Sequence, residues 1–372
     1  MAKSKYAKYV NPLRLWTESV RPSYRGKMAD FSLLFDEKVY PDTTCWVETF
    51  YAYAPGAGVG VPGALPSVFN GVERKPTAKP WGQHAHPGFD ELFLFFGTDP
   101  RDNTRLGGEV EAWLGEGNDA QKFIIKEPTA KWVPKDLAHN PWIVTRVDNP
   151  KYPIIIMVIA LSPRYNVQQN DWRNLPHPPA FSMDKLGIEQ PGKGLYTDNV
   201  KKISFSTDRI FPWLRTRVTM PTLMFDKTII PNVPIWVEWF HVYAGGCGIG
   251  VPALDIPQRK LPDGTTFDST KGMSHSHNFD ELFLFIPADP HDTFNLGGEV
   301  VTWLGKGDEA EQFTLTKSSS VWVPANVHHN PQYYRQVQAE KSYFMIVIAF
   351  TKTYYGEDAK MEPARITKPF IW

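Results

Sequence analysis

The heptapeptide FDELFLF at positions 89–95 recurs unchanged at positions 279–285, which lie 190 residues further along the chain. The same spacing relates three more pairs of matching segments: LGGEV at 106 and 296, WLG at 113 and 303, and WVP at 132 and 322. The spacing changes in one place, where His84 aligns with His275. A spacing this constant indicates two homologous domains in tandem, each of about 190 residues.

Each copy contains short apolar or β-branched segments that are separated by Gly, Pro, Asn and Asp, the residues typical of turns. In the first copy the expected strands are 44–53, 90–96, 109–114, 122–126, 131–134 and 154–161. Helical periodicity is weak outside short pieces near the N-terminus. We therefore predict an all-β chain with a few short helices, in which each copy forms an antiparallel sandwich or barrel.

The chain has 372 residues, which is enough for about two domains. The repeat predicts an N-terminal domain over residues 1–165 and a C-terminal domain over residues 203–372. Residues 166–202 are rich in Pro and polar side chains, and we expect them to form the connecting segment between the domains.

Charge and cysteine content exclude several classes of function. The 40 basic and 40 acidic side chains balance, so the chain has no long-range attraction to nucleic acid or to an anionic membrane. Cys45 and Cys247 are too few for a disulfide framework, and the first residues lack the apolar stretch of a signal peptide. The longest apolar runs, 154–161 and 344–350, are shorter than the roughly 20 residues needed to cross a bilayer. We expect a cytoplasmic protein that acts on a small molecule, without a nucleic-acid or membrane partner.

Both copies carry the same pattern of polar residues: two histidines one residue apart, a glutamate shortly after them, and a distant third histidine. The eight residues are His84, His86, Glu91 and His139 in the first copy, and His275, His277, Glu281 and His329 in the second. Since side chains alternate along a strand, both histidines of an H-x-H pair face the same side. Three imidazoles and one carboxylate suit Mn, Fe, Co, Ni, Cu or Zn. The pattern predicts a metal site in each domain.

Other interpretations of these residues compete with metal binding. A buried histidine with a satisfied hydrogen bond is commoner than a metal ligand, but here the complete set occurs twice in register. Asp90 and Asp280 precede the glutamates, and alternation along FDELFLF places each Asp on the opposite face from its Glu. His328 adjoins His329 but aligns with Ala138, so we expect it to lie outside the metal site.

These motifs resemble the cupin signature, H-x-H-x(3–4)-E followed by P-x-G-x-x-H, and the duplication makes the chain similar to a bicupin. The resemblance covers residues 30–160 and 220–350, with Asp136 and Asn326 in place of the motif's glycine. It implies two tandem jelly-roll, or double-stranded β-helix, barrels. It also implies that the eight residues bind one divalent metal per domain, with Mn or Fe expected and Zn, Ni, Co or Cu as alternatives. Other departures from the signature, such as the longer connection at 98–106 and 288–296, leave the subfamily open.

Cupin relatives with such a site include oxygenases, decarboxylases, isomerases, hydrolases and non-enzymatic binders, so the ligand set leaves the reaction open. The aromatic side chains in the same strands favour a flat, cyclic substrate over a two-carbon acid. The first hypothesis is a dioxygenase-like enzyme that cleaves the ring of a small catecholic or enolic substrate. The second is redox-neutral hydrolysis or ring opening of a cyclic dicarbonyl, and the third is a non-catalytic metal- or sugar-binding protein.

Three further residues are candidates for catalysis. Glu48 and Glu238 occupy equivalent positions in the apolar segments WVETF and WVEWF, and His241 follows in the second of these. A carboxylate there is either a paired structural group or an inward-facing acid–base residue near the metal. Bicupins resemble fused dimers of single cupins and often assemble further, so the chain is compatible with a homo-oligomer.

Overall fold

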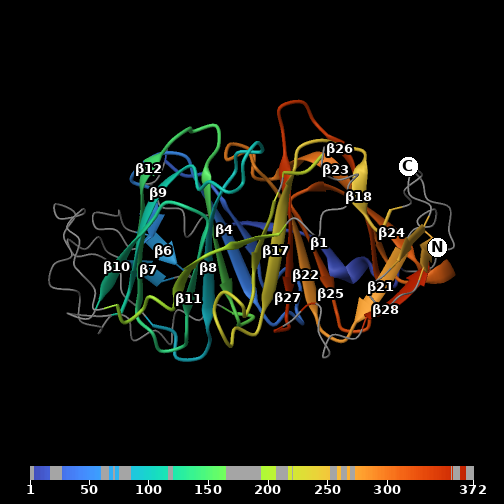
Figure 1. Ribbon diagram of the computed structural model, residues 1–372, viewed down its shortest axis with the longest axis horizontal. Coiled ribbons are helices and arrows are strands. Elements are labelled where there is room, and N and C mark those ends of the chain that lie inside the picture. The colour runs from blue at the N-terminus through green and yellow to red at the C-terminus, as the bar shows by residue number, and fades with distance from the viewer. Residues whose placement is uncertain are drawn as a thin grey trace. The chain divides into compact units, whose positions relative to one another are not determined.

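The computed structural model of the protein describes residues 4–16, 27–59, 67–69, 72–74, 85–115, 120–164, 194–206, 217–219, 221–251, 258–260, 266–268, 273–352, 354 and 361–365 (Figure 1). Over these residues the regular structure is almost entirely β-strand, with the 3₁₀ helices η1 (Ala7–Tyr9) and η7 (Gly307–Glu309). The predicted all-β fold is confirmed. None of the described helices is long and apolar enough to cross a membrane.

The chain divides into two compact units, whose bounds differ from the predicted domains at the ends of each copy. The N-terminal unit is Leu13–Ser204 with Ala288–Thr293, and the C-terminal unit is Met1–Pro12, Phe205–Pro287 and Phe294–Trp372. The first twelve residues therefore group with the second copy, because their strand pairs there. Of the predicted connecting segment, residues 166–193 lie outside the described part of the chain, and residues 194–202 belong to the N-terminal unit.

Two antiparallel sheets form the body of the N-terminal unit. The larger sheet has the order β14 (Val200–Lys202), β11 (Thr129–Val133), β8 (Glu91–Gly97), β13 (Ile154–Ala160), β4 (Trp46–Ala52), β3 (Ser32–Phe35) and β2 (Arg14–Trp16). The smaller sheet has the order β10 (Gln121–Ile125), β9 (Gly108–Leu114), β12 (His139–Val147) and β5 (Gly58–Val59). A separate ribbon pairs β6 (Ser67–Phe69) with β7 (Val72–Arg74).

The C-terminal unit repeats this architecture. Its larger sheet has the order β1 (Val10–Pro12), β25 (Ser319–Val323), β22 (Glu281–Pro287), β27 (Tyr343–Ala349), β17 (Trp236–Val242), β16 (Thr222–Phe225) and β15 (Ser204–Ser206). Its smaller sheet has the order β24 (Glu311–Lys317), β23 (Asn295–Leu304), β26 (His329–Val337), β21 (Met273–His277) and β28 (Met361–Arg365), with β18 (Cys247–Ile249) also on β26. A separate ribbon pairs β19 (Gln258–Lys260) with β20 (Thr266–Asp268).

In each unit the two main sheets contribute side chains to one apolar core. In the N-terminal unit the core includes Trp46, Phe50, Phe93 and Phe95 from the larger sheet and Val110, Leu114 and Trp142 from the smaller one. The corresponding residues of the C-terminal unit are Trp236, Phe240, Phe283, Phe285, Val300 and Leu304. Since side chains alternate along a strand, these residues define the inner face of each sheet. Glu91 and Glu281 lie on that inner face, at the first positions of β8 and β22.

The first strand of each copy pairs within the unit built mostly from the other copy. Strand β1 pairs with β25, and the equivalent strand of the second copy, β14, pairs with β11. Figure 1 shows the blue N-terminal segment beside the orange strands of the second copy. The exchanged segments are anchored by equivalent tyrosines, since Tyr6 lies against Gly305 and Tyr196 against Gly115. A Cβ on either glycine would meet the tyrosine ring at under 3 Å, and both glycines have positive φ.

All six strands expected in the first copy are present within a few residues of their predicted ends. The strand β12 was not among them, although it is one of the longest in the unit. Its sequence begins HNP, which is typical of a turn, and register shifts interrupt its pairing with β9. This strand matters for the site because its first residue is His139.

Candidate metal centres

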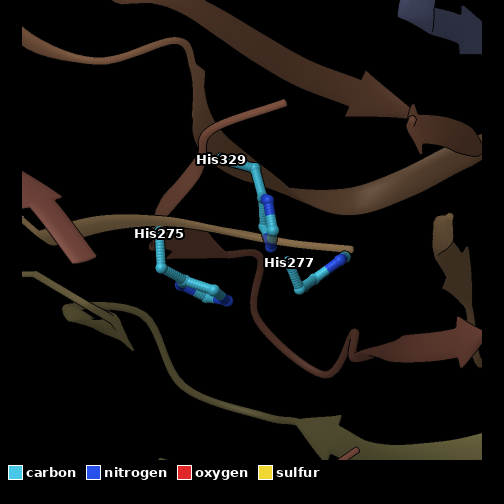
Figure 2. A group of neighbouring side chains, drawn as sticks. All are labelled: His275, His277 and His329. Carbon is cyan, nitrogen blue, oxygen red and sulfur yellow. The ribbon is translucent and has the colours of Figure 1, made fainter. Parts of the chain in front are cut away.

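The C-terminal unit brings His275, His277, His329 and Glu281 together between its two sheets. His275 and His277 lie on β21, His329 begins β26 beside them, and Glu281 begins β22 on the facing sheet. Figure 2 shows the three histidines as close neighbours, with His329 above His275 and His277. The Nε2 atoms of His277 and His329 lie 3.2 and 3.1 Å from Oε2 of Glu281. One sheet therefore supplies the three histidines and the facing sheet supplies the glutamate, and the packing of the two sheets brings the four side chains together.

These distances fit a bound transition metal. Ligand atoms about 2.1 Å from an ion and at right angles to each other are about 3 Å apart, and opposite ligands are about 4.2 Å apart. One potential ligand atom from each of the three histidines lies within 4.8 Å of the others. Nε2 of His275 and Oε1 of Glu281 are buried without a hydrogen-bond partner among the described residues. Such buried polar atoms are stabilised when they coordinate an ion.

Backbone carbonyls orient these imidazoles. Nδ1 of His277 donates to the carbonyl of Phe279 at 2.7 Å, and Nδ1 of His329 donates to that of Val327 at 3.1 Å. A proton held on Nδ1 leaves the lone pair of Nε2 directed at the ligand cluster. Burial, together with the neighbouring His329, lowers the pKa of His275 well below its usual value, so this ring is neutral at pH 7. Neutral imidazole is the form that binds a metal.

The N-terminal unit brings His86, Glu91 and His139 together in the same way. Nε2 of His139 lies 2.8 Å from Oε2 of Glu91, and Nε2 of His86 lies 3.4 Å from it. Nδ1 of His139 faces the carbonyl of Leu137 at 3.2 Å, which again directs Nε2 inward. The predicted fourth ligand, His84, lies outside the described residues. The three that are described fit an ion by the same spacing.

The two aspartates that precede the glutamates have a separate structural role. Asp90 accepts a hydrogen bond from the backbone N–H of Lys135 at 2.7 Å, and Asp280 accepts one from that of Ala325 at 2.8 Å. Each carboxylate thereby holds the loop that leads to the third histidine. The structure thus separates the Asp from the Glu within each FDEL segment, as alternation predicts.

Glu48 and Glu238 lie on the inner faces of their sheets, with the core residues of β4 and β17. Glu48 accepts a hydrogen bond from the Ser32 hydroxyl, and Glu238 accepts one from the Thr222 hydroxyl at 3.0 Å. Strands β13 and β27 separate them from the strands that carry the ligand glutamates. They therefore face the same interior of their units as the ligand glutamates.

The structure corrects the grouping of His241 with these glutamates. His241 follows Glu238 by three positions on β17, so alternation directs its ring to the opposite face of the sheet. There it is fully buried and stacks on Phe344, with ring centroids 4.3 Å apart. We assign it to packing of that outer face and not to the metal-facing interior.

His328 also points away from the ligands. Its ring nitrogens lie 3.2 Å from the Ser274 hydroxyl and 3.4 Å from the Ser276 hydroxyl. These serines alternate with the ligand histidines along β21, so they occupy its other face. His328 therefore braces the strand that presents His275 and His277.

Aromatic rings surround both ligand sets. His277 stacks on Phe279 with ring centroids 3.9 Å apart, and His86 stacks on Phe89 at 4.5 Å. Phe283 lies against His329 at 5.7 Å, and Phe93 lies against His139 at 5.8 Å. In the C-terminal unit Tyr354 adds a further ring, 6.0 Å from His277, which the sequence pattern did not indicate. Each site is consequently a polar cluster within an apolar, aromatic wall.

Sequence reasoning also missed a lysine beside the first site. Lys131 is fully buried on β11, and its Nζ lies 3.8 Å from the centroid of the Phe93 ring. A signal was present in the repeat, because AKWVP of the first copy aligns with SVWVP of the second and places Lys131 opposite Val321.

Comparison with known proteins supports the fold. No protein-family model and no curated protein matches the sequence. Among solved structures, an oxalate decarboxylase matches with a TM-score of 0.52 and 12% identity, over 95% of this chain and 79% of the other. A variant of the Bacillus subtilis oxalate decarboxylase matches with a TM-score of 0.52 and 11% identity over the same shares. These enzymes are bicupins, and the likeness extends over both copies of the repeat. The chain therefore has the two-domain cupin fold.

Proposed function

We propose that the protein is a metal-dependent enzyme that opens the ring of a small, oxygen-rich substrate, with one divalent ion in each unit. The observation that carries this proposal is the pair of buried ligand sets, each enclosed by aromatic rings. Mn and Fe are the metals we expect, because both accept a mixed set of imidazoles and one carboxylate.

A bound redox-active ion would bind the oxygens of a chelating catechol or enediol, polarise them and promote their reaction with dioxygen. The residues of the chain supply the surroundings for that chemistry. The phenylalanines beside the ligand histidines surround the sites with apolar rings, which suit a flat substrate. The carbonyls of Val327 and Leu137 hold the proton of each third histidine on Nδ1, so that Nε2 faces the metal.

The oxalate decarboxylases to which the chain is similar act on a two-carbon acid, as their name states. We infer a larger and flatter substrate here, because oxalate offers no apolar face to the rings that line the sites. The redox-neutral alternative is supported by one observation: Glu48 and Glu238 face the interior of their barrels and could act there as bases. Opening of a cyclic 1,3-dicarbonyl would need such a base and no oxidant.

Dioxygen dependence distinguishes the two reactions. The purified chain would be loaded with Fe(II) or Mn(II) and mixed with catechols or cyclic 1,3-diketones, in air and under argon. We expect oxygen uptake in step with product formation and no turnover under argon. Full turnover under argon would instead establish the redox-neutral reaction, in which case Glu48→Gln and Glu238→Gln should lower kcat.

The double variant His139→Ala/His329→Ala is the control for both reactions, since it removes one ligand from each site. Turnover that survives in this variant at the wild-type rate would rule out catalysis by these metal centres. If the metal binds and no compound of either class reacts, the protein is a metal-binding cupin and the proposal is wrong.

A further inference from the structure

The buried lysine of the N-terminal unit is a chemical difference between the two candidate metal centres. Lys131 has no exposed surface, and its Nζ has no hydrogen-bond partner among the described residues. Burying an amine without partners is costly, so the residue needs a compensating interaction. The contact of Nζ with the Phe93 ring supplies part of it, since a cation is attracted to a ring face.

Strand register places this amine beside the ligands. Lys131 pairs with Phe93 across β11 and β8, and the next inward-facing pair along the same strands is Val133 with Glu91. Phe93 in turn lies against the ring of His139, so one phenylalanine contacts both the amine and a ligand histidine. Electrostatics agree with this placement: the Lys131 charge contributes to lowering the pKa of His139 and opposes the rise that burial causes in the pKa of Glu91.

The C-terminal unit is a natural comparison. A row of residues that are paired across neighbouring strands of the larger sheet is the same in both units except at the position of Lys131. In the N-terminal unit the row is Lys131, Phe93, Val158 and Glu48, read across paired strands. In the C-terminal unit it is Val321, Phe283, Val347 and Glu238. The exchange of Lys for Val therefore changes one inward-facing side chain and leaves its neighbours in the row unchanged.

Charge counting shows what this exchange does to a loaded site. A divalent ion with one glutamate ligand leaves a net charge of +1, as in the C-terminal unit. Glu91 is the carboxylate whose charge acts on Lys131, and once Glu91 coordinates an ion the lysine faces a cationic centre. An anionic oxygen placed between the ion and Nζ would coordinate the ion and accept a hydrogen bond from the amine. Such a hydrogen bond is strong in a buried interior.

We propose that the N-terminal metal centre binds its ligand as an oxygen anion, a carboxylate or enolate, with one oxygen on the ion and a hydrogen bond from Lys131 Nζ. The C-terminal centre, with Val321 at that position, binds ligands without this donor. The inference rests on the metal sites of the proposed function and names the class of ligand that the first of them takes. An amine donates hydrogen bonds in either protonation state, so the contact does not depend on its titration.

The test measures ligand binding and needs no turnover. In the full chain, His329→Ala leaves the N-terminal centre as the loaded one, and Co(II) reports ligand binding there through its visible spectrum. Formate is the anionic probe and imidazole the neutral one. We expect Lys131→Met to weaken formate binding at least tenfold and to change imidazole binding less than twofold. Lys126→Met is the matched control, because it removes the same charge from an exposed side chain of the same unit, and it should alter neither probe.

A second pair of measurements covers the case in which Lys131→Met does not fold or bind Co(II). Lys131→Arg should keep formate affinity within a few-fold, whereas Lys131→Gln should weaken it. Equal formate affinity in wild type and Lys131→Met, or equal weakening of formate and imidazole, would overturn the proposal. So would a Co(II)-loaded N-terminal centre that fails to bind formate. If the protein turns over no substrate but Lys131→Met still loses affinity for formate and not for imidazole, the proposed reaction is contradicted and this inference stands.

Discussion

At the residue scale, the candidate centres depend on single backbone carbonyls that fix the direction of an imidazole. The rings of His139 and His329 each face the backbone carbonyl of the residue two positions earlier in the chain. The loop just before β12 or β26 therefore orients the histidine that begins the strand. The neighbouring His328 lacks this arrangement and bonds to serines on the other face of β21. Adjacent histidines in one segment thus have different roles.

We predict that His139→Ala and His329→Ala each reduce the bound metal from two equivalents to one, because each removes a ligand from a different centre. Elemental analysis of the dialysed variants would measure this. His328→Ala is the control and should keep both equivalents, since its ring faces away from the cluster. Two full equivalents in either ligand variant would show that the assigned residue does not bind the ion.

A second prediction concerns the two free thiols, Cys45 and Cys247. Burial raises the pKa of each to about 12, so at pH 8 roughly one molecule in ten thousand carries the reactive thiolate. We expect no labelling by a disulfide reagent in the native protein and labelling of both thiols in denaturant. Rapid labelling of the native chain would mean that one of these cysteines is exposed.

At the element scale, the exchange of β1 and β14 ties each copy of the repeat to the other. Each exchanged strand occupies the edge of a seven-stranded sheet and covers the strand β25 or β11, which would otherwise present unpaired backbone groups. The tyrosine that precedes each strand packs against a glycine of the unit that receives it, which fixes where the segment enters. The edge of each metal-bearing sheet is consequently completed by the other copy.

The paired variants Tyr6→Ala and Tyr196→Ala test this exchange. Loss of a large packed aromatic costs about 3–5 kcal/mol when it is fully buried, and somewhat less at an edge. We expect Tyr6→Ala to increase hydrogen exchange in β25 and leave β11 protected, and Tyr196→Ala to do the reverse. If Tyr6→Ala loosens β11 instead, the strands are not exchanged in this way.

The sequence predicted most strands of the first copy but not this exchange. Alternation and turn residues are local, so they reveal segments such as β4, β8 and β13. Pairing of β1 with β25 joins residues more than 300 positions apart, and nothing in the three-residue strand itself indicates that partner. The strand β12 was missed for a different reason, because HNP is locally a turn signal and only its packing between β9 and β5 makes it a strand.

At the scale of the whole molecule, two copies of one fold carry two centres that are alike in ligands and unlike in surroundings. The ligand sets bridge the two sheets of each unit, with a glutamate on one sheet and histidines presented from the other side. An ion there would connect the sheets, so its binding should stabilise each unit separately. Binding to the folded state alone stabilises it by about 2.7 kcal/mol at a hundred times the dissociation constant.

We therefore predict that a strong chelator lowers the thermal unfolding temperature of the metal-loaded protein, and that added Mn(II) restores it. Differential scanning calorimetry would measure the shift. His139→Ala/His329→Ala is the control, because a chain without complete sites should unfold at the same temperature with and without chelator. An unchanged unfolding temperature in the wild-type protein would show that the ions do not bridge the sheets.

The sequence by itself determined the duplication and the all-β class, and it supplied the residues that we propose as metal ligands, because repeats, alternation and ligand spacing can be read along the chain. Tertiary structure alone decided which faces meet. It joined His329 to His275 and placed Glu281 across from them, it turned His241 to the outer face, and it brought Lys131 to the first site. These outcomes depend on pairing between strands that are far apart in the sequence. Such pairing brings side chains to the same face of a sheet, and no local sequence pattern indicates which strands will pair.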